Sequence, residues 1–190
     1  SLETSWGNAT VSIPLFGTFN ISNVLSAVAT LLAEGERFED VMRVVNALHP
    51  VKGRMEVFAF DSHANVVVDY AHTPDALEKV LASARAHTRG EVWCVFGCGA
   101  DHIVITTDNC RTEAPEAIAS DIISGLKSPE RAVCEADREK AIRYCLNKAK
   151  PEDLIVVAGK GHEDYQIIGT TKTDYNERAV LARLQKEYSK

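Results

Sequence analysis

From residue 55 onward, short apolar stretches alternate with amphipathic helical patterns, and this alternation limits the fold more than any other feature of the chain. Short apolar runs bounded by turn residues are typical of buried strands. The expected strands span residues 55–60, 65–70, 91–96, 102–107, 132–134, 154–158 and 165–168, and the expected helices span 73–87, 115–126, 138–149 and the chain from about 176. Strands that alternate with helices form a parallel sheet covered on both faces. The sequence therefore predicts an α/β fold with a doubly wound, mostly parallel sheet.

The first part of the chain carries a different pattern. Apolar residues recur at helical spacing over residues 24–32 and again over 41–48, which predicts two consecutive helices. Two such helices in succession are typical of the end of a domain, and residues 51–54 have the character of a linker. We therefore expect one unit over residues 1–52 and a second over residues 53–190.

One connection interrupts the alternation of strands and helices. The strand that ends at Gly97 is separated from the strand that begins near His102 only by Cys98-Gly99-Ala100-Asp101. Parallel neighbours are usually joined by a crossover of about a dozen residues or more. The pattern therefore predicts that a loop and a helix are missing from the sequence at this place, and a short antiparallel hairpin is the alternative.

Composition and charge exclude several classes of protein. A net charge of -6 disfavours a protein that tracks nucleic-acid phosphates, which usually has a basic surplus, although a local basic pocket for a small anion is compatible with it. The five cysteines form no C-x-x-C pair, which argues against a disulfide framework and a zinc site. There is no apolar run long enough for a transmembrane helix and no signal-peptide pattern at the N-terminus. We therefore expect a cytoplasmic protein with reduced thiols and no membrane contact.

In open α/β sheets, ligands bind beyond the carboxyl ends of the strands, so the residues after each strand are candidates for a site. Asp69 and His72 follow the second expected strand and precede a helix, with Thr73 as its expected N-cap and Pro74 as its first residue. Two interpretations carry about equal weight: hydrogen bonding to a ribose or base edge, or a simple turn before a capped helix. Gly97-Cys98-Gly99 after the third strand would allow close approach to an anion, but G-x-G alone is a weak signal.

Asp108, Asn109, Cys110 and Arg111 follow the fourth expected strand. The arginine can bind a carboxylate through two hydrogen bonds, and the aspartate can accept from an ammonium group. An arginine close to acids is otherwise a local salt-bridge cluster. The position at a strand end favours the functional interpretation.

Gly159-Lys160-Gly161 and Glu163 follow the strand over residues 154–158. The segment is not a Walker A motif, because the first glycine and the Ser/Thr after the lysine are absent. Glu163 can receive an amine, and the simpler alternative is a polar turn. Arg54 could reach a phosphate across a cleft and Asn23 could cap a helix, although an isolated arginine is more often only solvated.

Taken together, these segments resemble those of the Mur ligases. In chain order they are Phe19-Asn20-x-x-Asn23, Gly53-Arg54-Met55-Glu56, Asp69-Tyr70-Ala71-His72-Thr73-Pro74-Asp75, Phe96-Gly97-Cys98-Gly99, Asp108-Asn109-Cys110-Arg111-Thr112-Glu113 and Gly159-Lys160-Gly161-His162-Glu163-Asp164-Tyr165-Gln166. The similarity covers nearly the whole chain and is greatest to the members that add meso-diaminopimelate to UDP-N-acetylmuramoyl-L-alanyl-D-glutamate. Several motifs in one order are far more specific than any one of them alone.

The resemblance implies a domain organisation. Mur ligases have a UDP-binding domain, a central ATPase domain and a C-terminal Rossmann-like domain that receives the amino acid. Residues 1–52 would then be the end of the ATP-binding domain, and residues 53–190 the Rossmann-like domain. The P-loop, the magnesium ligands, the carbamylated lysine and the UDP site lie upstream in the family, so no catalytic and no metal-binding residue is expected in this chain.

The resemblance also implies an activity. The whole ligase would use ATP and Mg²⁺ to form an amide through an acyl phosphate in peptidoglycan synthesis. Its partners would be small molecules, namely meso-diaminopimelate, ATP and the UDP-MurNAc-dipeptide, and it would act as a monomer. This chain alone would bind the amino acid without catalysing its ligation.

The implied roles fall on two groups of residues. The nucleotide group is Asn23 near the adenine, Arg54 at an ATP phosphate, and Asp69 and His72 beside the nucleoside. The amino-acid group is Asp108, Asn109, Cys110 and Arg111 at the family's D-N-P-R motif for diaminopimelate, with Gly159 and Glu163 at the distal end of that amino acid.

The chain departs from the family pattern at two places. Cys110 stands where the motif has a proline, which would fix the backbone of the loop. A basic loop and a helix that follow Gly97-Cys98-Gly99 in the family, including an arginine that binds the substrate carboxylate, are absent, so weaker binding is expected. Two other hypotheses stay open: a Mur-type ligase for another amino acid such as lysine, and a Rossmann-like module that binds only a nucleotide. Binding of diaminopimelate compared with lysine would distinguish them.

Overall fold

The computed structural model describes residues 1–96 and 100–189. The chain divides into two units, Ser1–Val51 and Lys52–Lys190. The sequence placed this boundary after residue 52.

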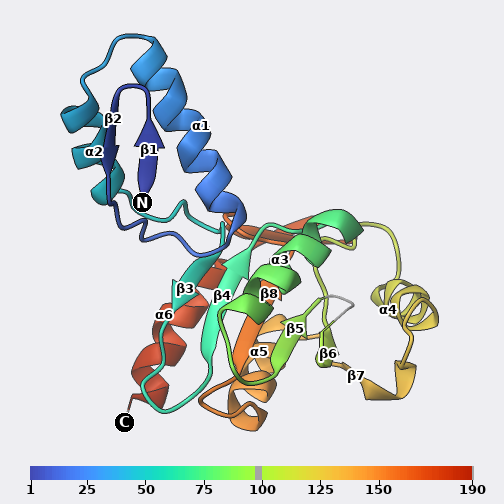
Figure 1. Cartoon of the computed structure of the whole chain (residues 1–190). Helices are drawn as coiled ribbons and strands as arrows, with labels where there is room; N and C mark the ends of the chain where they lie inside the picture. Colours follow the sequence, from blue (N-terminus) through green and yellow to red (C-terminus); the bar gives the residue numbers. More distant parts are fainter. Residues whose placement is uncertain (97–99, 190) are drawn as a thin grey trace. The chain divides into compact units, whose positions relative to one another are not determined.

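The first unit combines a short hairpin with two helices (Figure 1). Its elements are β1 (Leu2–Thr4), β2 (Gly7–Ala9), α1 (Phe19–Ala33) and α2 (Phe38–Asn46), with β1 and β2 antiparallel. The buried side chains that join the two helices recur at helical spacing: Val24, Val28, Leu32, Val41, Met42 and Val45. The two helices expected from this spacing are therefore confirmed.

The second unit is built on a six-stranded sheet with the order β3-β4-β8-β5-β6-β7. The strands are β3 (Glu56–Phe58), β4 (Asn65–Asp69), β5 (Val92–Val95), β6 (His102–Ile105), β7 (Ala132–Cys134) and β8 (Leu154–Ala158). Only the edge strand β3 is antiparallel to its neighbour, and every other pairing is parallel. The predicted α/β fold with a mostly parallel sheet is confirmed.

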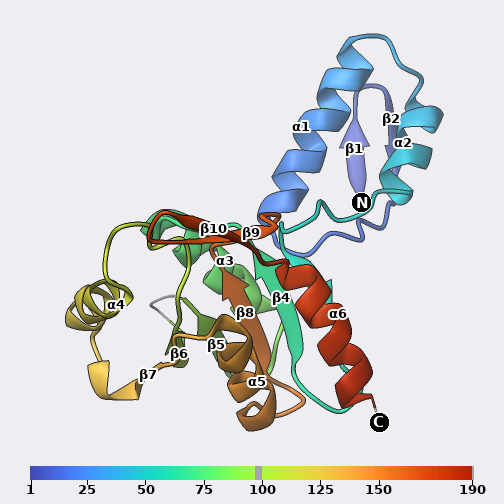
Figure 2. The ribbon, with the colours of Figure 1, turned by 180° about the vertical axis from the view of Figure 1, so that it is seen from behind.

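Helices cover both faces of this sheet (Figures 1 and 2). The helical elements are α3 (Pro74–Ala86), α4 (Pro115–Ser124), the short 3₁₀ helix η1 (Pro129–Arg131), α5 (Arg138–Lys148) and α6 (Glu177–Tyr188). Figure 1 shows α3 on one face, and Figure 2 shows α5 and α6 on the other. Thr73 caps α3 as expected, because its hydroxyl accepts a hydrogen bond from the Ala76 N–H. None of the helices in the described part of the chain is long and apolar enough to cross a membrane.

The core of the second unit lies between the sheet and its helices. Strands β5 and β8 are buried along their whole length, which explains their uninterrupted apolar sequences. The core cluster on the α5 and α6 side includes Val66, Val68, Ile155, Val157, Ile142, Leu146, Leu181 and Leu184. This packing fixes the strand ends that carry the polar segments described below.

A second small sheet follows β8. It is the antiparallel hairpin of β9 (Tyr165–Ile168) and β10 (Thr171–Asp174). The sequence predicted β9 but not β10, because every residue of β10 is exposed and its sequence, TKTD, has no apolar alternation.

Strands β5 and β6 are parallel neighbours despite their short connection, with Trp93 opposite His102. The antiparallel hairpin considered above is therefore wrong. Six residues, 96–101, separate the two strands in sequence. The expected Gly97-Cys98-Gly99 motif lies outside the described residues.

Candidate functional site

The carboxyl ends of β4, β6 and β8 lie at one edge of the sheet, because the three strands run parallel within it. The polar segments at residues 69–72, 106–111 and 159–163 follow these three strands. Parallel strands deliver such segments to a common edge, where ligands of α/β proteins bind. Most of the residues singled out from the sequence therefore lie in one region.

A fully buried lysine stands at the centre of this region. The Lys160 ammonium lies 2.9 Å from Asp108 Oδ1 and donates to Asn109 Oδ1 at 3.1 Å and to the Tyr165 carbonyl at 2.8 Å. Glu163 Oε2 lies 3.9 Å from the same nitrogen. A buried charge has to be paired and hydrogen-bonded, and this one is.

Asn109 links the loop after β6 to the loop after β8. Its side-chain NH₂ donates to Glu163 Oε2 at 2.9 Å, and its oxygen accepts from Lys160 and, at 3.0 Å, from the Ile167 N–H. The surrounding charges determine the orientation of the amide, since its oxygen faces the cation and its nitrogen faces the carboxylate. The hydroxyl of Tyr165 lies 3.4 Å from the other Glu163 oxygen.

Gly159 leaves the space in which the Asp108 carboxylate lies. Its φ is +108°, and a Cβ at this position would lie 2.5 Å from Asp108 Oδ2. The structure thus brings Asp108, Asn109, Gly159 and Glu163 together around Lys160. Both carboxylates are partly exposed, and Asp108 lies closer than Glu163 to the buried ammonium.

Cys110 and Arg111 are held against β9. The backbone N–H of Arg111 donates to the Ile167 carbonyl at 3.2 Å, and its carbonyl accepts from the Gly169 N–H at 2.6 Å. Arg111 has φ +52°, which is strained for a residue with a side chain and persists only where the surroundings enforce it. Its guanidinium is exposed and makes no hydrogen bond or ion pair within residues 1–96 and 100–189.

Two charged side chains shift the pKa of the Tyr165 hydroxyl in opposite directions. The Glu163 carboxylate raises the pKa of Tyr165, and the positive charge of Arg111 partly opposes this effect. Tyr165 is therefore under the electrostatic influence of one negative carboxylate and one positive guanidinium.

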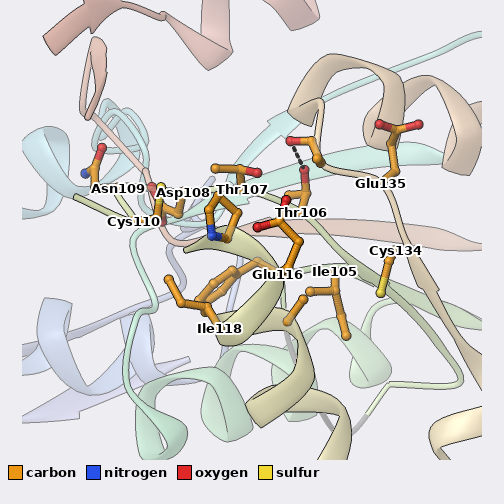
Figure 3. A pocket seen from close by; sticks show the side chains of 14 residues that line it. Ile105, Thr106, Thr107, Asp108, Asn109, Cys110, Glu116, Ile118, Cys134 and Glu135 are labelled. Atoms are coloured by element: carbon orange, nitrogen blue, oxygen red, sulfur yellow. Dashed lines mark hydrogen bonds between the residues drawn. The ribbon is translucent and has the colours of Figure 1, made fainter. Parts of the chain in front are cut away.

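A cavity of about 380 Å³ adjoins the loop after β6 (Figure 3). Figure 3 shows Asp108, Asn109 and Cys110 at one end and Cys134 and Glu135 toward the other. Ile105 and Ile118 supply apolar lining, and Glu116 comes from the first turn of α4. The cavity offers room for an aliphatic chain beside the charged groups.

A second group of side chains gathers around Tyr70. The Arg54 guanidinium lies over its ring at 4.9 Å, and the rings of His72 and His162 lie 4.7 Å and 5.1 Å from it. Arg54, His72 and His162 are exposed. A cation, two imidazoles and an aromatic ring together suit a ligand that has both an anionic part and a flat ring.

The Asp69 carboxylate, at the end of β4 next to Tyr70, accepts hydrogen bonds from two backbone N–H groups. One carboxylate oxygen accepts from the Met55 N–H at 2.9 Å and the other from the Ala71 N–H at 2.8 Å. Burial raises the pKa of Asp69, although the hydrogen bonds and the charge of Arg54 act in the opposite direction. Asp69 is buried and fixes the left-handed backbone of Met55, φ +45°.

Asn23 belongs to the other unit, where it lies in α1 and donates to Asn20 at 3.1 Å. Within the described parts of the chain, no three His, Cys, Asp or Glu side chains gather in a way that could hold a metal ion.

Three residues of the site had no assigned role in the sequence. Lys160 was considered only as part of a Gly-Lys-Gly segment that is not a Walker A motif, and Tyr70 and His162 were only quoted within their motifs. The glycines on both sides of Lys160 were the available signal, because they let a tight turn direct the side chain inward. Two of its partners, Asp108 and Asn109, lie about fifty residues away in sequence, so no local spacing could have identified them.

Comparison with known proteins is consistent with this fold and these motifs. A family model described as the glutamate ligase domain of Mur ligases matches residues 53–102 and 98–161, two stretches that meet at the connection between β5 and β6. A solved UDP-N-acetylmuramoyl-L-alanyl-D-glutamate–2,6-diaminopimelate ligase is 32% identical with a TM-score of 0.68, over 97% of this chain and 42% of its own.

More distant structures share the fold. A UDP-N-acetylmuramate-alanine ligase from Thermotoga maritima is 17% identical with a TM-score of 0.64, over 94% of this chain and 39% of its own. A folylpolyglutamate synthase from Mycobacterium tuberculosis, solved with ADP and AMPPCP, is 18% identical with a TM-score of 0.62, over 78% of this chain and 39% of its own. The chain thus spans less than half the length of each structure. Its family match and its 32% identity over almost all of its residues show that the chain belongs to the Mur ligase family.

Proposed function

We propose that this chain is the C-terminal part of an ATP-dependent ligase that adds meso-diaminopimelate to UDP-MurNAc-L-Ala-D-Glu in peptidoglycan synthesis. In this proposal, residues 53–190 bind the incoming amino acid and residues 1–52 complete an ATP-binding domain. The ligase is cytoplasmic and monomeric. The chain by itself binds ligand and does not catalyse ligation.

The observation that carries the proposal is that Glu163 lies 3.4 Å from the hydroxyl of Tyr165 in β9, while the backbone of Arg111 is hydrogen-bonded to Ile167 of the same strand. The far end of diaminopimelate carries one ammonium and one carboxylate. Glu163 is a partly exposed acid, less closely paired with Lys160 than Asp108 is, and can accept from the ammonium. Arg111 is the exposed guanidinium that can bind the carboxylate through two hydrogen bonds. The aliphatic chain of the ligand has room in the cavity beside Asp108, Asn109 and Cys110.

The group around Tyr70 is proposed as the contact with ATP. Arg54 suits a phosphate, and His72 suits the nucleoside, because both side chains are exposed beside an aromatic ring. Asp69 supports this contact indirectly by holding the Met55 and Ala71 amides. Asn23 is assigned to the adenine. In the whole ligase, ATP with Mg²⁺ supplies the phosphoryl group that activates the substrate carboxylate, and the metal ligands lie outside this chain.

Isothermal titration calorimetry with the 190-residue chain tests the proposal. The ligands are meso-diaminopimelate and L-lysine, which differ by one carboxylate. A hydrogen bond to a charged group contributes about 1.5–3 kcal/mol, so meso-diaminopimelate should bind about ten- to a hundredfold more tightly. Arg111→Gln should remove this preference and leave lysine binding little changed.

Each other outcome selects a different hypothesis. Equal binding of the two amino acids would indicate a Mur-type ligase for another substrate. ATP binding without amino-acid binding would indicate a nucleotide-binding module. Weak binding that keeps the preference for diaminopimelate would fit the absence of the family's basic loop after Gly99.

A further inference from the structure

We propose that Lys160 is a positioning residue of the amino-acid site: it neutralises Asp108, fixes Asn109, and leaves Glu163 as the acid that binds the ligand's ammonium group. This inference rests on the proposed function. Lys160 itself does not contact the ligand.

The contacts of Lys160 tie together three parts of the chain. Its ammonium binds the carboxylate of Asp108 and the amide of Asn109 in the loop after β6, and the carbonyl of Tyr165 in β9. Lys160 itself belongs to the loop after β8 and has no exposed surface. One buried cation therefore sets the mutual positions of all three segments.

The charges around Lys160 divide the two acids into different roles. Asp108 lies beside Lys160, and its carboxylate also acts on the buried guanidinium of Arg138. Glu163 is farther from the ammonium, at 3.9 Å, and is held by the Asn109 NH₂. Both acids are partly exposed, with 20% of the Asp108 side chain and 16% of the Glu163 side chain accessible, so exposure does not separate them. Because the ammonium lies closer to Asp108, Glu163 keeps the less compensated charge and is the acid available to an incoming cation.

The backbone on both sides directs the lysine inward. Gly159 has φ +108° and Gly161 has φ +52°. A Cβ at Gly161 would lie 2.6 Å from Tyr70 Cβ, and one at Gly159 would meet Asp108. The two glycines thus let the chain turn tightly on both sides of Lys160, so that its ammonium group is buried. The segment does not present the lysine to a phosphate.

A cycle of variants tests this role by calorimetry with meso-diaminopimelate. Lys160→Met keeps an unbranched side chain and removes the nearest cation from Asp108, and Asp108→Asn removes the nearest anion from Lys160. Each single variant should bind at least about tenfold more weakly, the loss expected for one charge-assisted contact. The double variant Lys160→Met/Asp108→Asn removes both charges, so it should bind more tightly than either single variant.

The dissociation constant separates positioning from a purely structural role. A lysine that only stabilises the fold would lower the fraction of chains that bind, and hence the stoichiometry, but not the affinity of the folded fraction. Lys79→Met with and without Asp75→Asn is the matched control, because this exposed pair at 2.8 Å lies on α3 and should change neither quantity. An unchanged dissociation constant in Lys160→Met, or a double variant no better than the single variants, would overturn the proposal.

Urea unfolding of the same variants supplies a readout without ligand. If Lys160 compensates Asp108, the double variant should be more stable than Lys160→Met alone. If the unmodified chain binds neither amino acid, the proposed function fails, and the positioning role fails with it. The unfolding series then still decides whether the two charges compensate each other.

Discussion

Arg138 and Glu177 form an ion pair in which both side chains are shielded from water, with Arg138 Nε 2.6 Å from Glu177 Oε1. The guanidinium also donates to the Ala158 carbonyl at the end of β8, at 2.7 Å. Burial alone would lower the pKa of Arg138, but Glu177 outweighs this effect and the pKa is raised. The pair joins the starts of α5 and α6 to the strand that carries the site.

Removing one partner of this pair should be costly. Glu177→Gln leaves a buried guanidinium without its counter-charge, and such changes destabilise proteins by about 3–5 kcal/mol. Urea unfolding measures the effect. Asp75→Asn is the control, because its exposed pair with Lys79 should contribute about 0.3–0.5 kcal/mol. A loss for Glu177→Gln as small as that of the control would contradict the prediction.

Gly53 and Gly161 approach each other so closely that neither can carry a side chain. A Cβ on Gly53, φ +64°, would lie 2.1 Å from the Gly161 carbonyl carbon. Gly53→Ala should therefore destabilise the protein far more than the roughly 1–2 kcal/mol cost of a left-handed backbone alone. Gly169→Ala isolates that backbone cost, since its φ is +62° and nothing lies within 4 Å of its Cβ position. Similar unfolding free energies for the two variants would show that the approach is not tight.

Asp153 should make stability depend on pH in the acid range. Burial would raise its pKa, but hydrogen bonds from the Glu91 and Lys150 N–H groups and from the Trp93 indole outweigh burial and lower it. A lowered pKa in the folded state adds stability above the unfolded value of about 3.8, and this stability is lost as pH falls through the folded pKa.

Asp153→Asn checks this dependence. At pH 6 the variant should be less stable by about 1–3 kcal/mol, because buried donors lose their acceptor. The difference from the unmodified chain should shrink as pH falls below about 4. Urea unfolding followed by Trp93 fluorescence between pH 3 and 6 measures it, and a constant difference would contradict the prediction.

The thiols of Cys145 and Cys134 should differ sharply in reactivity. Cys145 is buried in the core, which raises its pKa to about 12, whereas Cys134 is exposed. Because the thiolate is the reactive form, Cys145 should react with iodoacetamide at pH 8 about a thousandfold more slowly than an ordinary thiol. Peptide mapping of the native and urea-unfolded protein distinguishes the two sites. Rapid labelling of Cys145 in the native protein would contradict its burial.

The sequence predicted those helices and strands that can be recognised from consecutive residues alone. The apolar runs of β4 and β8 are strands because both faces of the sheet are covered, and α3 begins where Thr73 and Pro74 indicate. The exposed strand β10 escaped prediction, because its pairing with β9 and not its composition makes it a strand.

The sequence singled out Asp108 and Glu163 as candidates, but it did not show how the charged groups around them are arranged. Asp108 and Glu163 stand at strand ends, which the order of strands and helices reveals. Their separation into a compensated and an available acid depends on Lys160 and Arg138, two buried charges that sequence patterns treat as surface residues. Only the fold brings these residues to the acids.

If Arg111 binds the ligand's carboxylate as proposed, its backbone contacts with β9 would give the β9–β10 hairpin an influence on ligand choice. The hairpin's Ile167 and Gly169 hold Arg111 in its left-handed conformation from both sides. A change in the length or twist of this exposed ribbon would move the guanidinium while every residue of the Asp108–Arg111 motif stayed the same. Under that proposal, relatives could differ in the amino acid they accept through a change in this hairpin, and comparison of the Asp108–Arg111 motif alone would overlook the difference.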